Sequence, residues 1–175
     1  MSINTIFLDR DGVINKDFNY IYKINDFIFI DGVFEACRHF HDLGFKIVIV
    51  TNQSGISRGY FTENDFKNIT NWMLNKFDDN NVNILDIFFC PHSPSLNCSC
   101  RKPEPGMFLK ARDKHDIDMK KSWMIGDSYR DITAANRAGI TNTILVRSGH
   151  KIIETNSNAK FIIDSIKDAS NIIVN

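Results

Sequence analysis

The chain has 175 residues, of which 43% are hydrophobic and 24% charged, and these values suit a globular protein with one hydrophobic core. Lys plus Arg and Asp plus Glu both number 21, so no excess of basic residues is available to hold a nucleic acid. The longest aliphatic run, residues 47–50, is too short to cross a bilayer, and the first residues lack a secretory signal. We therefore expect one domain over residues 1–175, cytoplasmic and monomeric, that binds neither nucleic acid nor membrane.

The first predicted strand, residues 5–8, ends at two carboxylates. Asp9 and Asp11 follow it one residue apart, and Gly12 comes next. A carboxylate at the end of a buried strand loses hydration, so it needs a compensating charge, and a metal ion is the usual one. The pattern indicates an enzyme site at this strand end.

Strand-like and helix-like segments alternate along the rest of the chain. Buried-strand patterns predict further strands at 47–50, 86–90, 122–125, 142–146 and 161–163. Apolar residues at helical spacing predict helices at 32–43, from 62 onward, at 104–115, after 128 and near 166–173. Thr62 with Asp65, and Ser128 with Asp131, have the spacing of capping boxes. The mostly polar segment 147–160 is predicted to be a surface loop.

This alternation predicts an α/β fold, a Rossmann-like and mostly parallel sheet with helices on both faces. Three of its strands would end in polar clusters, at residues 9–11, 51–55 and 126–128. Because ligands bind outside the carboxyl ends of parallel strands, we expect these clusters to meet in one crevice, together with Lys102. Asp9, Asp11 and Asp127 would repel one another there without a cation. Magnesium is the divalent ion that fits best, since it binds carboxylates, waters and a substrate phosphate together.

Three of the four cysteines lie close together in the sequence. Cys90 and His92 are followed, after five residues, by Cys98 and Cys100. In a reducing compartment this set predicts a closed tetrahedral site for a structural Zn²⁺, carried on a loop insert, rather than disulfides. Three free cysteines and an ordinary histidine are the alternative. Since Lys102 lies two residues after Cys100, the zinc would fix the loop that carries this cation.

The motifs, taken in order, resemble those of the haloacid dehalogenase superfamily of phosphohydrolases. They are Asp-x-Asp-Gly at 9–12, hydrophobic-Thr-Asn at 50–52, Arg-Lys-Pro at 101–103 and Gly-Asp at 126–127. The resemblance covers about residues 1–150. It implies Mg²⁺ held by the Asp9 carboxylate, the Asp11 backbone carbonyl and Asp127.

The resemblance also implies roles for individual residues. Asp9 would be the nucleophile that forms an aspartyl-phosphate. Asp11 would protonate the leaving oxygen and then activate water. Thr51, Arg101 and Lys102 would hold the phosphoryl oxygens and are counted as catalytic with the two acids.

The zinc insert narrows the resemblance to the heptose-bisphosphate 7-phosphatase branch, through the runs 8–15, 29–33, 50–56 and 98–107. This branch implies removal of the 7-phosphate from a small phosphorylated sugar, in the formation of nucleotide-activated heptose. Histidinol-phosphate phosphatases carry the same zinc loop and are the alternative. A non-catalytic, zinc-stapled interaction module is the third hypothesis.

The same branch implies substrate contacts from a flap, from the loop after the second strand and from positions beside the metals. The implied residues are Asp17, Phe18, Asn19, Tyr20, Thr51, Asn52, Gln53, Ser54, Arg101, Lys102 and Ser128.

Two features depart from the branch. The linker between His92 and Cys98 is short, which would reshape the pocket, and Ser128 stands where relatives often have a lysine near the distal phosphate. No long insertion follows the first two motifs, so we expect no large cap domain. The remaining histidines, His39, His41, His115 and His150, are predicted to be surface or packing residues.

Overall fold

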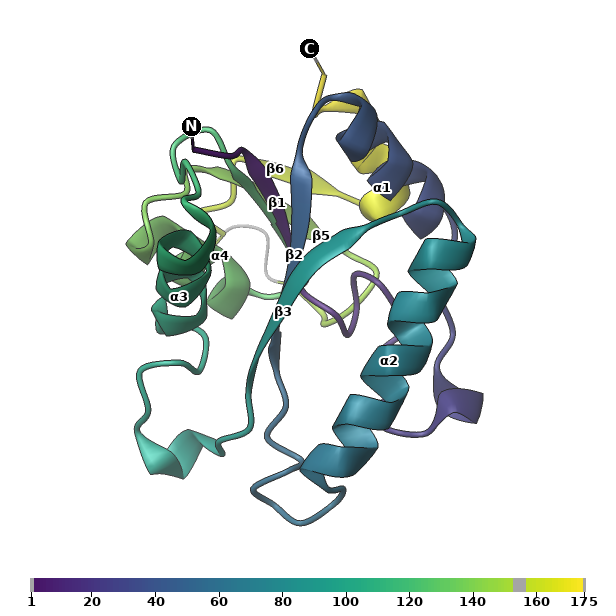
Figure 1. Ribbon diagram of the computed structural model, residues 1–175. Coiled ribbons are helices and arrows are strands. Elements are labelled where there is room, and N and C mark those ends of the chain that lie inside the picture. The colour runs from purple at the N-terminus through teal and green to yellow at the C-terminus, as the bar shows by residue number, and fades with distance from the viewer. Residues whose placement is uncertain (1, 153–156, 175) are drawn as a thin grey trace.

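The computed structural model describes residues 2–152 and 157–174 (Figure 1). Six strands form one parallel sheet in the order β3-β2-β1-β4-β5-β6. In chain order they are β1 (Thr5–Leu8), β2 (Lys46–Asn52), β3 (Ile84–Cys90), β4 (Trp123–Gly126), β5 (Asn142–Val146) and β6 (Phe161–Ile163). The chain builds outward from β1 to β3 and then returns to the other side of β1 with β4. Because the direction of winding reverses between β1 and β4, a crevice is expected at their carboxyl ends.

Helices cover both faces of the sheet (Figure 1). One face carries α1 (Val33–Asp42), α2 (Glu63–Asp79) and the 3-10 helix η4 (Ile166–Asn171). The other face carries α3 (Gly106–His115) and α4 (Tyr129–Arg137). Two short 3-10 helices, η1 (Ile24–Asp26) and η2 (Pro94–Leu96), lie in loops. Within the described residues, the segment from β1 to α1 contains only η1, which is too small to form a cap domain.

The central strands divide their side chains between the two helical layers. In β2, Ile47 and Ile49 belong to the core with α1 and α2, whereas Val48 and Val50 belong to the core with α3 and α4. Neighbouring side chains of a strand point to opposite faces, and both faces are covered, so the strand is an unbroken hydrophobic run. This explains why β2 gives such a clear strand signal in the sequence.

The predicted α/β fold is confirmed, and several element boundaries agree closely. β1, β5 and β6 have the predicted bounds, while β2 and β3 extend beyond the predicted ranges. The capping box at the start of α2 is present: Asp65 N donates to Thr62 Oγ1 at 3.1 Å, and Thr62 N donates to Asp65 Oδ2 at 2.8 Å. The second predicted box is also present at the start of α4. The last predicted helix is a six-residue 3-10 helix.

The segment after β5 differs from the predicted surface loop. Residues 153–156 of this segment lie outside the described residues. Before them, Ser148 Oγ donates to Gly12 O at 2.7 Å, and His150 N donates to Asp127 Oδ2 at 2.8 Å. The start of the loop therefore packs against the ends of β1 and β4, because its polar groups bond to groups exposed there.

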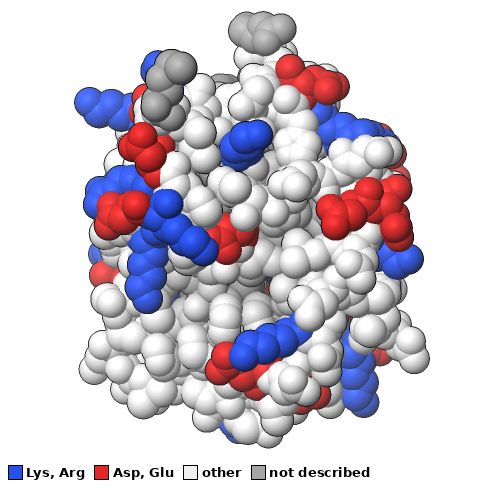
Figure 2. Space-filling model, viewed as in Figure 1, with Lys and Arg blue, Asp and Glu red and all other residues white. Residues whose placement is uncertain are grey.

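The charged side chains on the face shown in Figure 2 are mixed, with Lys and Arg beside Asp and Glu. This distribution agrees with the equal counts of the two kinds of charge. No helix of the described residues is both long enough and apolar enough to cross a membrane.

The packing of α2 generates a stability prediction. Phe77 is 0% exposed, and its ring centroid lies 5.3 Å from that of Phe34. Replacing Phe77 with Ala removes this packing and leaves a cavity, so we expect the free energy of unfolding to fall by about 3–5 kcal/mol. Urea unfolding followed by circular dichroism measures the change.

Phe18→Ala is the control for this measurement. Phe18 is 57% exposed, so its truncation should change the free energy of unfolding by less than about 0.5 kcal/mol. Equal losses in the two variants would contradict the assignment of Phe77 to the core.

Candidate active site

A cavity of about 290 Å³ lies at the carboxyl ends of β1, β2 and β4. Twelve residues named from the sequence line it: Asp9, Asp11, Asp17, Asn19, Tyr20, Asn52, Gln53, Ser54, Arg101, Lys102, Asp127 and Ser128. Five further residues line the cavity: Arg58, Pro94, Arg130, Asp131 and His150.

Two residues named from the sequence do not line this cavity. Thr51 is 1% exposed, and its Oγ1 accepts a hydrogen bond from Gln53 Nε2 at 2.9 Å. Phe18 lies on the flap with 57% of its surface exposed. The structure therefore keeps Thr51 next to the site, bonded to a lining residue, and leaves Phe18 outside it.

Lys102 is buried between two carboxylates of the cavity. Its Nζ lies 2.9 Å from Asp9 Oδ1 and 2.6 Å from Asp131 Oδ1, and it also donates to the Val50 carbonyl at 2.8 Å. Burial acts to lower the pKa of Lys102, but the carboxylates of Asp131 and Asp9 outweigh it and raise that pKa. The ammonium group therefore stays charged and holds the Asp9 carboxylate in place.

The surroundings of Asp9 carry more negative charge than Lys102 alone can balance. One carboxylate oxygen from each of Asp9, Asp127 and Asp131 lies within 4.8 Å of the others, and all three residues are buried. Burial, followed by the charge of Asp131, raises the pKa of Asp9 well above its ordinary value, although Lys102 acts against this. These oxygen donors and their excess negative charge suit a hard divalent cation.

Asp131 was predicted only as a helix cap. Its Oδ2 does accept hydrogen bonds from the backbone N–H groups of Ser128 at 3.0 Å and Asp127 at 3.1 Å. Its other oxygen forms the ion pair with Lys102. The capping signal in the sequence identified the first role, but the second depends on a residue far away along the chain and has no local signal.

The Asp11 side chain is held by three neighbouring residues. Arg10 Nη2 donates to Oδ1 at 2.9 Å, Asn15 Nδ2 donates to Oδ1 at 2.9 Å, and Gln53 Nε2 donates to Oδ2 at 3.0 Å. Arg10 is itself 2% exposed, and its Nη2 also donates to the Ile21 carbonyl at 2.8 Å. The carboxylate is thereby fixed in one orientation beside the cavity.

His150 was predicted to be a surface or packing residue, but the structure places it at the cavity. Its Nδ1 lies 2.6 Å from Asp127 Oδ2. This hydrogen bond raises the pKa of His150 to about 9, although burial acts in the opposite direction. A Cβ on the preceding Gly149 would overlap the same Asp127 carboxylate, so only glycine permits the loop to approach so closely. The polar composition of the loop gave no sign of this contact.

Asn52 was named as a substrate contact, and its amide bonds to the backbone of Lys102. Asn52 Oδ1 accepts from Lys102 N at 3.0 Å, and Asn52 Nδ2 donates to Lys102 O at 3.1 Å. This pair of hydrogen bonds joins the end of β2 to a loop 50 positions later in the chain. Asn52 therefore fixes the backbone from which the Lys102 side chain reaches Asp9.

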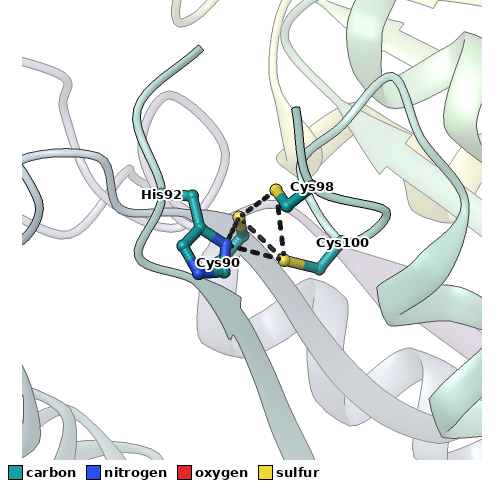
Figure 3. A group of neighbouring side chains, drawn as sticks. All are labelled: Cys90, His92, Cys98 and Cys100. Carbon is teal, nitrogen blue, oxygen red and sulfur yellow. Dashed lines mark hydrogen bonds between the residues drawn. The ribbon is translucent and has the colours of Figure 1, made fainter. Parts of the chain in front are cut away.

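The four predicted zinc ligands converge in one cluster (Figure 3). Cys100 Sγ lies 3.0 Å from Cys90 Sγ, 3.4 Å from Cys98 Sγ and 3.2 Å from His92 Nδ1. One nitrogen and three sulfur atoms that face one another in this way form the donor set of a closed tetrahedral site.

The loop that carries these four ligands, residues 90–100, is bonded to two lining segments of the cavity. Gln53 N donates to the Cys90 carbonyl at 2.7 Å. Arg101 Nη1 donates to the His92 carbonyl at 3.2 Å. A structural change in the cluster would therefore shift the loop that contains Gln53 and the segment that contains Lys102.

The flap, residues 17–20, holds an unusual backbone conformation beside the cavity. Asn19 and Tyr20 have φ angles of 62° and 54°, which non-glycine residues rarely adopt. Asn19 N donates to Asp17 Oδ1 at 2.8 Å, and the Tyr20 ring packs edge-on against Tyr60 at 4.7 Å between centroids. These contacts hold the flap in a conformation that turns Asp17, Asn19 and Tyr20 toward the cavity.

The buried ion pairs of Lys102 generate a second stability prediction. Lys102→Met leaves Asp9 and Asp131 buried without their cation, so we expect a loss of about 3–5 kcal/mol in the free energy of unfolding at pH 8. The pKa of Asp9 is already raised in the folded protein, and loss of Lys102 raises it further. The folded variant therefore binds protons more readily than the unfolded chain, and its deficit relative to the wild type grows as pH rises above about 4.

Urea unfolding at pH 5.5 and pH 8, without added divalent ions, measures this deficit. Lys114→Met is the control, because Lys114 is exposed and its ion pair with Asp86 lies at the surface. A deficit that is the same at both pH values would contradict the proposed charge balance around Lys102.

Known proteins share both the sequence and the fold of this chain. The HAD-hydrolase-like family model matches residues 99–169. The D-glycero-beta-D-manno-heptose-1,7-bisphosphate 7-phosphatase of Yersinia pestis is 45% identical over 175 aligned positions, and the alignment covers 95% of this chain and 93% of the relative. The D-glycero-alpha-D-manno-heptose-1,7-bisphosphate 7-phosphatase of Photorhabdus laumondii is 46% identical over 164 aligned positions, and the alignment covers 90% of each chain.

A solved structure extends the likeness to the whole fold. The crystal structure of the D,D-heptose 1,7-bisphosphate phosphatase from B. bronchiseptica, complexed with magnesium and phosphate, is 30% identical in sequence. It superposes with a TM-score of 0.84 and covers 97% of both chains. With this identity and coverage, the chain belongs to the haloacid dehalogenase-like phosphatases, in the family that contains these heptose-bisphosphate phosphatases.

Proposed function

We propose that the protein is a magnesium-dependent phosphatase that removes the 7-phosphate from D-glycero-D-manno-heptose 1,7-bisphosphate. The observation that carries the proposal is the Asp9 carboxylate, which Lys102 holds in a cavity at the carboxyl ends of the strands. The cavity lies where the strand order reverses, between β1 and β4. Relatives about 45% identical over nearly the whole chain bear the name of this activity. The reaction is hydrolysis of a phosphoric monoester.

The metal site in this proposal consists of Asp9, the Asp11 backbone carbonyl and Asp127. The crowding of Asp9, Asp127 and Asp131 supports it, because their carboxylate oxygens lie within 4.8 Å of one another and need more positive charge than Lys102 provides. Bound Mg²⁺ would neutralise charge on the phosphoryl oxygens and orient the phosphate for attack. Asp131 would keep Lys102 in place beside this site.

The first half of the reaction transfers the phosphoryl group to the protein. An Asp9 oxygen attacks phosphorus, and the bond from phosphorus to the sugar oxygen breaks. Asp11 gives its proton to that oxygen, so that the sugar leaves as an alcohol. In the second half, Asp11 takes a proton from water, the water oxygen attacks phosphorus, and Asp9 and inorganic phosphate are released.

Lys102 and Thr51 would hold the phosphoryl oxygens during both steps. The Lys102 ammonium lies 2.9 Å from Asp9 Oδ1 and stabilises negative charge that develops beside the nucleophile. The Thr51 Oγ1 already accepts a bond from Gln53, so its own O–H proton is available to donate to a phosphoryl oxygen. Asn52 would act as a positioning residue, since its amide is bonded to the Lys102 backbone.

Contacts to the sugar would come from the flap and from the loop after β2. Asp17, Asn19 and Tyr20 line one side of the cavity, and Gln53 and Ser54 line another. Their carboxylate, amide and hydroxyl groups suit the hydroxyl groups of a heptose. Phe18 would contact only a part of the substrate that extends beyond the cavity. The proposed substrate is thus a small phosphorylated sugar.

Replacing the nucleophile tests the mechanism. Asp9→Asn keeps the shape of the side chain but removes the attacking carboxylate, so we expect the rate of phosphate release from heptose 1,7-bisphosphate to fall on the order of 10⁴-fold or more. The assay contains Mg²⁺ and compares the α and β anomers with histidinol phosphate. Removing Mg²⁺ from the assay with a chelator of moderate affinity should also abolish phosphate release by the wild type.

Glu104→Gln is a matched control that removes a carboxylate elsewhere, since Glu104 is exposed and pairs with Arg137 at the surface. Wild-type turnover by Asp9→Asn would contradict the mechanism. A large preference of the wild-type enzyme for histidinol phosphate would contradict the proposed substrate.

We also propose that Cys90, His92, Cys98 and Cys100 bind a structural Zn²⁺. The convergence of one nitrogen and three sulfur atoms supports this, as does the absence of any disulfide among the described cysteines. Four protein ligands leave no position for a reacting water, so the ion would hold the loop rather than take part in hydrolysis. Through Arg101 and Gln53 the loop would also steady the phosphate site.

Removing one ligand tests this role. Protein purified without chelators should hold about one Zn²⁺ per chain by atomic emission, and Cys100→Ser should lose most of it. We expect a lower melting temperature and a lower kcat in this variant, because Lys102 follows the loop directly. Ser95→Ala, an exposed change in the same loop, should keep the ion and the activity. Wild-type protein that contains no zinc after such a preparation would rule out the site.

A further inference from the structure

Arg10 is a buried cation beside the candidate active site, and the proposed function gives it no task. It is 2% exposed, and it is not one of the described residues that line the cavity. Its guanidinium carbon lies 5.9 Å from the ring centroid of Phe27 and 5.9 Å from that of Phe66. A guanidinium group buried in this way loses its hydration, so contacts inside the protein must replace it. Arg10 is thus placed to act through its neighbours rather than on a substrate.

The hydrogen bonds of Arg10 are concentrated on one carboxylate. Nη2 donates to Asp11 Oδ1 at 2.9 Å and to Asp11 Oδ2 at 3.0 Å, and Nε donates to Oδ1 at 3.3 Å. Nη1, by contrast, finds no hydrogen-bond acceptor among the described residues. A buried donor without an acceptor costs free energy, so general stabilisation of the fold does not account for an arginine at this position. Its grip on Asp11 does.

The two oxygens of Asp11 are held to different degrees. Oδ1 accepts from two nitrogen atoms of Arg10 and from Asn15 Nδ2, which lies 2.9 Å away. Within the described residues, Oδ2 accepts from Arg10 Nη2 and from Gln53 Nε2, each at 3.0 Å. A carboxylate oxygen has about two lone-pair sites, so three donors leave none on Oδ1 for a proton. Gln53 lines the cavity, which places Oδ2 on the side where a substrate would bind.

The donors that hold Asp11 also hold the backbone on both sides of the flap, residues 17–20. Asn15 Nδ2 donates to the Lys16 carbonyl at 3.1 Å, just before the flap. Arg10 Nη2 donates to the Ile21 carbonyl at 2.8 Å, just after it. Because the same nitrogen atoms bond to the carboxylate and to the two ends of the flap, the positions of Asp11 and of the flap are set together.

We propose that Arg10 is a positioning residue for Asp11, which fixes the carboxylate so that Oδ2 carries the proton in both halves of the reaction. The inference rests on the proposed function for the roles of Asp9 and Asp11. In the first half the Oδ2–H bond breaks and the proton joins the oxygen of the leaving alcohol, which takes the electron pair of the broken bond to phosphorus. In the second half Oδ2 takes a proton from water as the water oxygen bonds to phosphorus and the bond from phosphorus to Asp9 breaks.

The test compares a substrate that needs a general acid with one that does not. The heptose leaves as a strongly basic alkoxide unless it is protonated, whereas p-nitrophenolate is a weak base and leaves without a proton. For Arg10→Met we expect turnover of heptose 1,7-bisphosphate to fall about 100-fold, because the acid is no longer held in place. Release of the first p-nitrophenol from p-nitrophenyl phosphate should slow less than about threefold. Later turnovers should be slow, because Asp11 must still act as the base, so stopped-flow traces should show a burst.

Two further variants keep the inference falsifiable. Arg10→Lys retains the charge but cannot donate from two nitrogen atoms at once, so it should show the same selective loss, reduced to about tenfold. Phe77→Leu is the matched control for lost stability, since Phe77 is also buried and belongs to the core with α1 and α2. It should leave the ratio of the two rates unchanged. If both Arg10 variants lower the two rates in equal proportion, or leave heptose turnover unchanged, the inference is overturned.

Hydrogen exchange tests the link to the flap without turnover. In Arg10→Met the amide groups of residues 17–21 should exchange at least about tenfold faster than in the wild type, and in Phe77→Leu they should not. Unchanged exchange would remove the link.

A change of substrate separates this inference from the proposed function. If the wild type hydrolyses p-nitrophenyl phosphate but not the heptose bisphosphate, the proposed substrate is wrong. Phenyl phosphate, whose leaving group is more basic, then takes the place of the sugar. A loss in Arg10→Met that is larger for phenyl phosphate than for p-nitrophenyl phosphate would still support the role of Arg10, and equal losses would overturn it.

Discussion

The ammonium group of Lys102, buried between Asp9 and Asp131, is the interaction on which the site depends. Lys102 is only 2% exposed, and a charged group buried to this degree is tolerated only when opposite charges and hydrogen bonds surround it. Here two carboxylates and the Val50 carbonyl surround it. The same contacts also stabilise the two carboxylates, because Asp9 and Asp131 could not remain ionised together without a cation. Mutual neutralisation thus fixes the carboxylate of Asp9, the proposed nucleophile, at the end of β1.

Two segments hold the backbone of Lys102 in position: the end of β2 and the loop of residues 90–100. Asn52, at the end of β2, bonds both backbone groups of Lys102, so the lysine is tied to the sheet. The loop of residues 90–100, which carries the four predicted zinc ligands (Figure 3), ends two residues before Lys102. These two segments are hydrogen-bonded to each other, since Gln53 N donates to the Cys90 carbonyl. The proposed phosphate site and the proposed zinc site therefore share one backbone framework, although their metals would have different tasks.

Much of this arrangement was readable from the sequence, for physical reasons that can be stated. Buried strands such as β2 and helix caps such as Thr62 are decided by local composition, so they were predicted. The cysteine-histidine cluster was predictable because all its ligands lie within one short segment. Asp131 was recognised as a cap but not as the partner of Lys102, and His150 was assigned to the surface. Arg130 was also missed as a cavity residue, because only the tertiary fold brings the start of α4 to the other lining segments.

The distances along the chain between bonded residues bear on how the molecule assembles. The Lys102–Asp9 pair joins residues 93 positions apart, whereas Cys90 and Cys100 are separated by only 10. Closing a short loop costs little chain entropy, and thiolates can capture a metal before the rest of the chain is ordered. The contacts around Lys102 require β1, β2 and β4 to be aligned, which is a slow, non-local event. The cysteine-histidine loop would thus form early in folding, and the catalytic centre would come into being only with the completed sheet.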